Sequence, residues 1–184
     1  MTADMTYRIR PLAPREAGAR VPELADVLID CVEGGASVSF MLPITRATAE
    51  GFWRKVAEGV AAGERIVLVA EEPDGRIVGT VQLIVSQPEN QPHRADVAKM
   101  LVHRRARRQG LAERLLAAIE QQAREAGKTV LVLDAVTGGD AERLYARAGW
   151  QRVGSIPNYA LMPDGEPCAT TYFHKQLVPM VQRP

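Results

Sequence analysis

Cysteine, aromatic residues and net charge are all scarce in this chain of 184 residues, and each scarcity excludes a class of protein. The two cysteines, Cys31 and Cys168, are far apart, with no CxxC pair and no histidine at ligand spacing, which argues against a disulfide scaffold or a metal site. Aromatic residues make up 5% of the chain and do not interleave with basic residues as base-stacking platforms would. A formal net charge of +1 is too balanced for a dedicated nucleic-acid binder. We therefore expect neither a metal nor a nucleic-acid partner.

Long apolar runs are missing too, which argues against a membrane partner. The longest are short segments such as Val130–Leu133, whereas a membrane helix needs about 20 apolar residues. The first residues carry charge where a secretory signal needs an apolar core. Apolar residues make up 46% and charged residues 24%, as in ordinary globular proteins. The sequence predicts one domain over residues 1–184, located in the cytoplasm, and leaves monomer and homodimer open.

Hydrophobic periodicity predicts strands and helices in an order that suits one mixed sheet. Alternating or β-branched runs indicate seven strands, and apolar residues at helical spacing indicate four helices. The predicted class is α/β, with helices on both faces of the sheet. The expected strands are Tyr7–Pro11, Arg65–Glu71, Arg76–Ser86, Ala95–Val102, Thr129–Ala135, Trp150–Ser155 and Thr170–Leu177. The expected helices are Pro14–Val32, a segment from Thr45 or Thr48 to Gly63, a long helix from Gly110 to Ala126, and Asp140–Ala148.

The most informative segment is the basic turn between the strand ending at Val102 and the long helix. A helix start leaves about four backbone N–H groups unpaired and carries partial positive charge. Gly110 lets an anion approach the backbone closely, and Ala112 keeps a second position nearly bare. Four arginines, at positions 104, 105, 107 and 108, add positive charge. The combination predicts a cradle for a pyrophosphate.

Two motifs in the second half of the chain resemble those of one enzyme superfamily. The pattern Arg107-x-x-Gly110-x-Ala112, after a strand and opening a helix, resembles the acetyl-CoA-binding motif of the GNAT superfamily of N-acetyltransferases, written R/Q-x-x-G-x-G/A. The segment 140–150 (DAERLYARAGW) is similar to a later helix of that superfamily. The chain departs from the family pattern at Gly138, where Asn is common, and at Arg108, where Gly is frequent.

This resemblance implies a fold, a cofactor and a set of contacts. The implied fold is a central mixed sheet of about seven strands, splayed between the strands ending at Val102 and Asp134. The implied cofactor is acetyl-CoA, its pantetheine in the splay and its pyrophosphate on the turn. The implied cofactor contacts are Met100, Leu101, Val102, Arg107, Arg108, Gln109, Gly110, Leu111, Ala112 and Tyr145.

The resemblance also implies a reaction, which is acetyl transfer to a primary amine by direct attack in a ternary complex. The tyrosine of the later helix, here Tyr145, commonly protonates the coenzyme sulfur in the family; a core tyrosine is the alternative. Asp134 and Asp96 are the candidate bases, because a carboxylate beside the splay can take the proton of an ammonium. A loop-anchoring or strand-start carboxylate explains each aspartate equally well. All three are expected to be catalytic.

The acceptor side is less sharply indicated. Glu33 and Phe40 are candidate residues of the acceptor pocket, because the first helix pair often forms its wall in the family. The segment 156–165 (IPNYALMPDG) resembles the tabtoxin-resistance-like branch, which implies a small amino-acid-like toxin, an antibiotic or a related amine as acceptor. Three alternatives stay open: a protein N-terminal acetyltransferase, an acyl-CoA-binding sensor, and a phosphate-binding module for nucleic acid.

Overall fold

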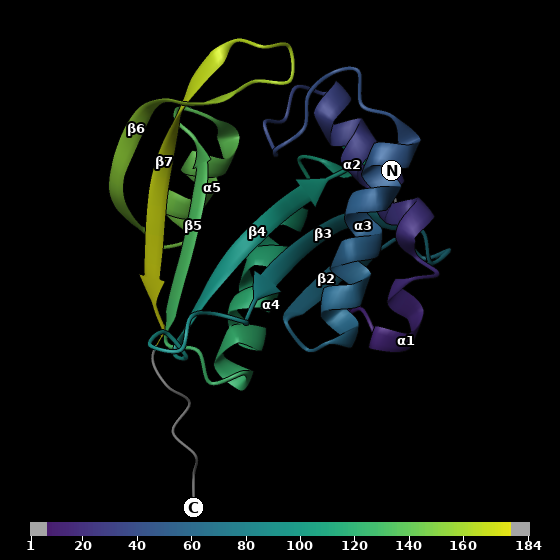
Figure 1. Ribbon diagram of the computed structural model, residues 1–184, viewed down its shortest axis with the longest axis horizontal. Helices are drawn as coiled ribbons and strands as arrows, with labels where there is room; N and C mark the ends of the chain where they lie inside the picture. Colours follow the sequence, from purple (N-terminus) through teal and green to yellow (C-terminus); the bar gives the residue numbers. More distant parts are fainter. Residues whose placement is uncertain (1–6, 178–184) are drawn as a thin grey trace, which may run out of the picture.

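The computed structural model describes residues 7–177 and contains one seven-stranded sheet with helices on both faces (Figure 1). The strand order is β1-β2-β3-β4-β5-β7-β6. This confirms the predicted mixed α/β sheet. The strands are β1 (Arg8–Pro11), β2 (Arg65–Glu71), β3 (Ile77–Ile84), β4 (Arg94–Val102), β5 (Val130–Val136), β6 (Gln151–Leu161) and β7 (Pro167–Gln176). The α-helices are α1 (Pro14–Ala17), α2 (Val21–Glu33), α3 (Arg46–Ala61), α4 (Leu111–Glu125) and α5 (Asp140–Arg147), and a short 3-10 helix covers Arg104–Ala106.

The centre of the sheet splits between β4 and β5. These two parallel strands pair only from Arg94↔Val130 to Asp96↔Val132, and then they diverge. Beyond that point β4 stays paired with β3, whereas β5 stays paired with β7 as far as Val136. Figure 1 shows the two strands meeting at one end of the sheet and opening into a V toward the other. The predicted splay is therefore present.

Each face of the sheet has its own apolar core, because the central strands are buried on both sides. Along β2, Leu68 and Ala70 face the core that α4 and α5 cover. The alternate residues Val67 and Val69 face a second core, which α1, α2 and α3 cover. The first of these cores joins the two halves of the split sheet, because it contains residues of β2, β3 and β4 together with residues of β5 and β7. Within residues 7–177 no helix has both the length and the apolar content to cross a membrane.

The N-terminal helix differs from the prediction. A single helix over Pro14–Val32 was expected, but α1 ends at Ala17 and α2 begins at Val21. Proline at position 22 explains the break, because in a continuous helix its ring would clash with the carbonyl of Gly18. Of the two possible caps for the next helix, Thr45 is the one used, since its hydroxyl accepts the amide of Thr48 at 3.1 Å.

The last hairpin is longer than predicted. The strand expected to end at Ser155 continues as β6 to Leu161, and β7 already begins at Pro167. The pairing is irregular between Ile156 and Ala160, where the segment includes Pro157. Because β6 is the edge of the sheet, the missing N–H of this proline leaves no interior hydrogen bond unmade. The turn signal at 163–165 was correct, and the hairpin that it closes reaches the α2–α3 loop.

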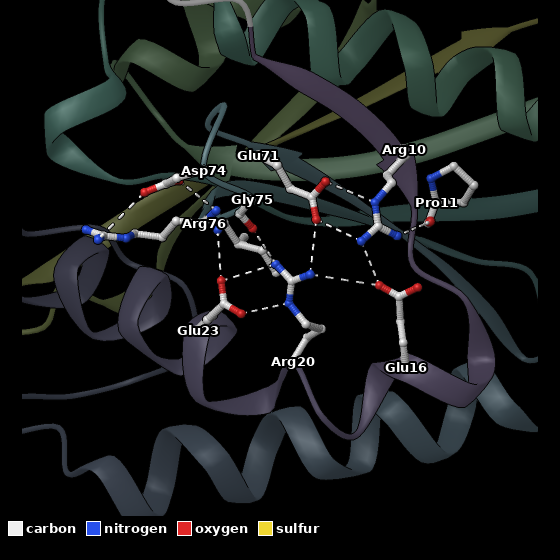
Figure 2. Close-up of polar contacts among 10 residues, drawn as sticks. Arg10, Pro11, Glu16, Arg20, Glu23, Glu71, Asp74, Gly75 and Arg76 are labelled. Atoms are coloured by element: carbon white, nitrogen blue, oxygen red, sulfur yellow. Dashed lines mark hydrogen bonds and ion pairs between the residues drawn. The ribbon is translucent and has the colours of Figure 1, made fainter.

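A buried carboxylate ties the first strand and the first helices to the sheet (Figure 2). Glu71, at the end of β2, is 5% exposed and accepts hydrogen bonds from Arg10 at 2.7 Å and 3.0 Å. Arg20 donates to the same carboxylate at 3.1 Å, and it pairs with Glu23 at 2.7 Å. Arg10 also pairs with Glu16 at 2.7 Å. One carboxylate thus links β1, β2 and the break between α1 and α2.

We expect Glu71→Gln to lower the free energy of unfolding at pH 7 by about 1–3 kcal/mol, since it leaves two guanidinium groups without their shared charge. Burial alone would raise the pKa of Glu71, but the hydrogen bonds and charges of Arg10 and Arg20 outweigh it and lower the pKa below the ordinary 4.5. A carboxyl with a lowered pKa stabilises the fold above that ordinary value and loses its contribution as the pH falls through the folded value. The variant should therefore lose less stability than the wild type on acidification below about pH 4.5.

Chemical denaturation at a series of pH values measures both effects. Glu58→Gln is the matched control, because Glu58 is exposed on α3. Equal stability of the Glu71→Gln variant and the control at pH 7 would contradict the structural role of this carboxylate.

Candidate active site

The turn that opens α4 presents backbone amides to an open approach. The first hydrogen bond of the helix joins the amide of Arg114 to the carbonyl of Gly110 at 3.1 Å. The amides of residues 111–113 therefore find no acceptor among residues 7–177. Gly110 has a φ of 71°, and a Cβ built on it meets no atom within 4 Å. Free amides at a helix start beside open space at Gly110 are what an anion site requires.

Arg108 also has a left-handed backbone, with a φ of 61°. This conformation is easy for glycine and strained for other residues, which gives a physical reason why the family often has glycine there. The Arg108 side chain makes no hydrogen bond or ion pair with the described part of the chain, so it is available to a bound anion.

The other arginines of the turn are occupied, which corrects the expectation that all four serve an anion. Arg104 binds Asp30 of α2 at 2.9 Å, and Arg105 binds Glu72 at 3.1 Å. Burial alone would raise the pKa of Asp30, but hydrogen bonds from Arg104 outweigh it and lower that pKa. The two carboxylates come from segments far from the turn in sequence, so local charge counting could not find them.

Arg107 is also engaged within the described chain. Its Nε donates to the carbonyl of Val102 at 3.0 Å, and its Nη2 lies 3.8 Å from the Cys31 sulfur. Arg107 therefore closes the turn onto the end of β4. Gln109 likewise holds the turn in place, since its amide oxygen accepts the hydroxyl of Tyr7 at 3.0 Å.

The remaining predicted cofactor residues lie along the edge of the split. From residue 97 to Val102 the edge of β4 that faces β5 has no partner strand within the described chain. Met100 and Leu101 lie on this stretch, and Leu101 packs into the core beneath it. At the helix start, Leu111 is 2% exposed and anchors α4 in the core, whereas Ala112 is half-buried. An unpaired strand edge beside unpaired helix amides can bind a chain of amides that ends in phosphates.

Tyr145 lies on α5 and packs against two aromatic rings. Its ring centroid is 5.9 Å from that of Trp150 and 5.9 Å from that of Phe173, and the residue is 4% exposed. Burial, together with the negative charge of Asp134, raises the pKa of Tyr145 to about 12. The hydroxyl therefore keeps its proton at neutral pH and can donate it.

Asp134 lies on β5, two residues beyond the last pair with β4, and so on the open part of the V. Its side chain is exposed in the cleft, but the cleft walls exclude part of the water that would otherwise solvate the carboxylate. This desolvation raises the pKa of Asp134, the nearby Asp96 raises it further, and the Lys99 ammonium opposes the rise. The charge of Asp134 therefore interacts electrostatically with Tyr145, with Lys99 and with Asp96.

Asp96 is more heavily engaged than Asp134. It forms an ion pair with Arg94, and its Oδ2 accepts the amide of Gln87 at 3.0 Å. It belongs to the last β4–β5 pair, at the point where the V begins. The structure brings both predicted bases to the same cleft, with Asp134 free of such partners.

A cavity of about 310 Å³ lies at the wide end of the V. Phe40 lines this cavity, whereas Glu33 does not; Glu33 ends α2, 4.0 Å from the Arg104 guanidinium. The cavity is bridged where the α2–α3 loop meets the β6–β7 hairpin, through a 2.8 Å hydrogen bond from the Ser37 hydroxyl to the Leu161 carbonyl. The full lining is Ser37, Ser39, Phe40, Met41, Asp134, Ala135, Val136, Tyr159, Ala160, Leu161 and Thr170.

Two polar features of this cleft were not predicted. Lys99 lies in a β-bulge of β4 and donates to the hydroxyl of Ser39 at 3.1 Å. The hydroxyls of Tyr159 and Tyr172 lie 2.7 Å apart at the opposite wall. A bulge leaves no mark in the alternation of a strand, and the partner of each residue comes from a distant segment. Within residues 7–177 no three His, Cys, Asp or Glu side chains gather in a way that could hold a metal ion.

The chain matches the acetyltransferase (GNAT) family over residues 41–150. It is 36% identical over 114 residues to an uncharacterized N-acetyltransferase from the hisH–hisA intergenic region of Azospirillum brasilense, a match that spans 61% of this chain and 66% of that protein.

Solved structures agree in fold. The chain resembles a protein from Acinetobacter baylyi with a TM-score of 0.79 and 13% identity, over 100% of this chain and 99% of that one. It also resembles a protein from Salmonella typhimurium, solved with its cofactor acetyl-CoA, with a TM-score of 0.74 and 18% identity over 97% and 98% of the two chains. The family match covers more than half of the chain and includes β4, the turn before α4, and α5; the chain is a member of the acetyltransferase (GNAT) family.

Proposed function

We propose that this protein transfers an acetyl group from acetyl-CoA to the primary amine of a small molecule, by direct attack within a ternary complex. The observation that carries the proposal is the V between β4 and β5, which has unpaired helix amides at one side and Asp134 in its open part. The family match supports acetyl-CoA as the cofactor.

The residues of the cleft fit that cofactor. The free amides at 111–113, the clear space over Gly110 and the unengaged Arg108 suit a pyrophosphate. The open edge of β4, which includes Met100, suits a chain with amide groups, because it offers backbone donors and acceptors. When bound, acetyl-CoA supplies an activated acyl carbon in a thioester.

Asp134 acts as the base in the proposed mechanism. An alkylammonium titrates near ~10.4, so its proton must leave before the nitrogen can attack. The Asp134 carboxylate takes this proton, directly or through a water molecule. Its raised pKa, caused mainly by desolvation in the cleft, makes its carboxylate a better proton acceptor than an ordinary aspartate. Asp96, held by Arg94 and Gln87, keeps a second negative charge beside the ammonium.

Tyr145 acts as the acid. Its hydroxyl stays protonated well above neutral pH and is within electrostatic reach of Asp134. We infer that it gives its proton to the sulfur that leaves the acyl carbon. Packing of its ring between Trp150 and Phe173 fixes the direction of the hydroxyl.

The size of the cavity supports a small acceptor, since about 310 Å³ is at the lower end of ligand pockets. We infer that the acceptor is amino-acid-like, such as a toxin or antibiotic of that class, as the resemblance of segment 156–165 implies. That segment supplies Tyr159, Ala160 and Leu161 to the cavity wall. The free thiols Cys31 and Cys168 support a reducing compartment, and we place the reaction in the cytoplasm.

Gly110→Val should abolish acetyl-CoA binding, because its side chain would occupy the clear space in front of the amides of α4. Titration calorimetry with acetyl-CoA measures this. Gly127→Val is the matched control: Gly127 closes the far end of the same helix with the same φ of 71°, so it carries equal backbone strain away from the turn. Wild-type affinity in the Gly110 variant would show that the pyrophosphate lies elsewhere.

Tyr145→Phe should reduce kcat by about 10²–10⁴-fold with little change in acetyl-CoA affinity, because the ring still packs while the acid is lost. Steady-state thiol release gives kcat, and calorimetry gives the affinity. Tyr172→Phe removes another hydroxyl near Asp134 and should reduce kcat far less than Tyr145→Phe does. Unchanged turnover in Tyr145→Phe would make Tyr145 a core residue only.

Asp134→Asn should preserve the fold and lose most turnover at neutral pH, with partial recovery at high pH, where more of the acceptor is already deprotonated. In the wild type the acidic limb of kcat/KM should lie above the ordinary aspartate value of 3.8, because the raised pKa of Asp134 keeps it protonated to higher pH. Asp96→Asn should show a smaller loss. A pH–rate profile of each variant tests whether its aspartate is the base. Wild-type rates across the whole pH range would exclude that aspartate.

A further inference from the structure

Lys99 is held in an unusual backbone conformation beside the acceptor cavity. Along β4 the pairing with β3 passes from Leu101↔Thr80 to Ala98↔Gln82, so Lys99 and Met100 together face one residue of β3. Lys99 has a φ of 50°, in the left-handed region that non-glycine residues rarely adopt. Bulges of this kind redirect a side chain, and strained backbone of this kind tends to gather at functional sites.

The residue that receives the Lys99 ammonium is strained in the same way. Ser39 has a φ of 78°, and its hydroxyl accepts from Lys99 Nζ at 3.1 Å. Ser39 and the adjacent Phe40 both line the cavity, and Lys99 Nζ lies 6.0 Å from the Phe40 ring centroid and 5.6 Å from that of Phe52. Two costly backbone conformations therefore cooperate to hold one cation at the cavity wall.

The Lys99 ammonium has hydrogen-bond donors that are not used within the described residues. An ammonium has three N–H donors, and among residues 7–177 the only hydrogen-bond acceptor of Lys99 is Ser39. No carboxylate of that range lies within ion-pair distance, although Asp134 is close enough to act on Lys99 electrostatically. The side chain is half-buried and partly desolvated, so an anion that enters the cavity gains a partner that water solvates incompletely. Ser39 adds its own O–H as a further donor.

The cavity therefore has a positive and a negative side. Asp134 attracts the amine of an acceptor, and Lys99 repels a second positive charge but attracts an anion. We propose that Lys99, together with Ser39, binds a carboxylate of the acceptor, so that the substrate class is amines that carry a carboxylate near the reacting nitrogen. This inference rests on the proposed acetyl transfer and narrows its acceptor. It makes Lys99 a specificity-determining residue of the acceptor pocket.

Matched pairs of acceptors test this inference. A panel of L-amino acids is compared with their methyl esters, which lack the negative charge, and with their phosphonate analogues, which keep a negative charge in another oxyanion. Thiol release from acetyl-CoA reports kcat/KM for each. Wild type should prefer the carboxylate over the ester by about 10- to 100-fold, the range expected for a charge-assisted contact.

Lys99→Met keeps the length of the side chain and removes its charge. It should abolish the preference mainly by raising KM for the carboxylates, while Lys99→Arg keeps part of it. An ester also changes the pKa of the amine, but equally for both proteins, so the change in the ratio isolates Lys99. Lys55→Met, at an exposed position of α3, controls for loss of a positive charge and should leave the ratio unchanged. Melting curves verify that each variant is folded.

The outcomes distinguish a failure of the role assigned to Lys99 from a failure of the proposed acetyl transfer. Turnover of esters with no carboxylate preference, or an equal preference in wild type and Lys99→Met, overturns the role of Lys99 and leaves acetyl transfer intact. A preference for phosphonates over carboxylates overturns the choice of anion. Acetylation of Lys99 itself on incubation with acetyl-CoA, seen by peptide mass spectrometry, would make it an internal acceptor instead. Absence of turnover with every amine, together with no acetyl-CoA binding, overturns the proposed function and the inference with it.

Discussion

The early end of pairing between β4 and β5 is the constraint on which the rest of the site depends. Three parallel residue pairs hold the two halves of the sheet together, and beyond Asp96↔Val132 both strands keep only their outer partners. Backbone hydrogen bonds left unmade inside a protein are costly, so this gap is retained only where something else can use it. The core under α4 and α5 joins the two halves instead, since it contains residues from both sides of the V. A fully paired sheet of the same strands would have no such opening.

Many charged side chains of this protein form ion pairs that connect one segment of the fold to another. Glu71 joins the first strand to the sheet, and Asp30 and Glu72 fix two arginines of the turn before α4. Three groups around the V differ from this pattern: Arg108, Asp134 and Lys99 have no opposite charge within ion-pair distance in the described chain. The charges of Asp134 and Lys99 also interact with each other across the open part of the V.

Much of the fold could be predicted from the sequence because the signals are local. The strand β5 begins with the continuous apolar run Val130–Leu133, and Gly110 and Gly127 delimit α4 as turn chemistry requires. The break near Gly18 was missed although Pro22 signals it, because the apolar stripe continues across the break. The length of β6 was missed because Pro157 is a poor strand residue except at an edge, and edge position is a property of the assembled sheet.

The site was only partly predictable, for the same reason. Gly110 and Tyr145 belong to short motifs that the sequence displays, and Asp134 ends an apolar run; in the fold Asp134 lines the cavity and acts electrostatically on Tyr145. The partners of the arginines, the distance of Glu33 from the cavity and the bulge at Lys99 all depend on segments that meet only in the folded chain. The bulge in particular changes the direction of a lysine without changing any residue type. Counting alternate positions cannot detect it.

The bridge between the α2–α3 loop and the β6–β7 hairpin has a consequence for how the protein can change over generations. Much of the cavity wall comes from the α2–α3 loop and the end of β6, which share no residue with the turn before α4 and meet through contacts such as the Ser37–Leu161 hydrogen bond. Substitutions at positions 39–41 or 159–161 can reshape the acceptor side while the amides at 111–113 stay where they are. Descendants of this chain can therefore diverge in the amine they modify and still inherit one acyl donor. The two regions are separate along the chain, because the segments 39–41 and 159–161 lie on either side of the amides at 111–113.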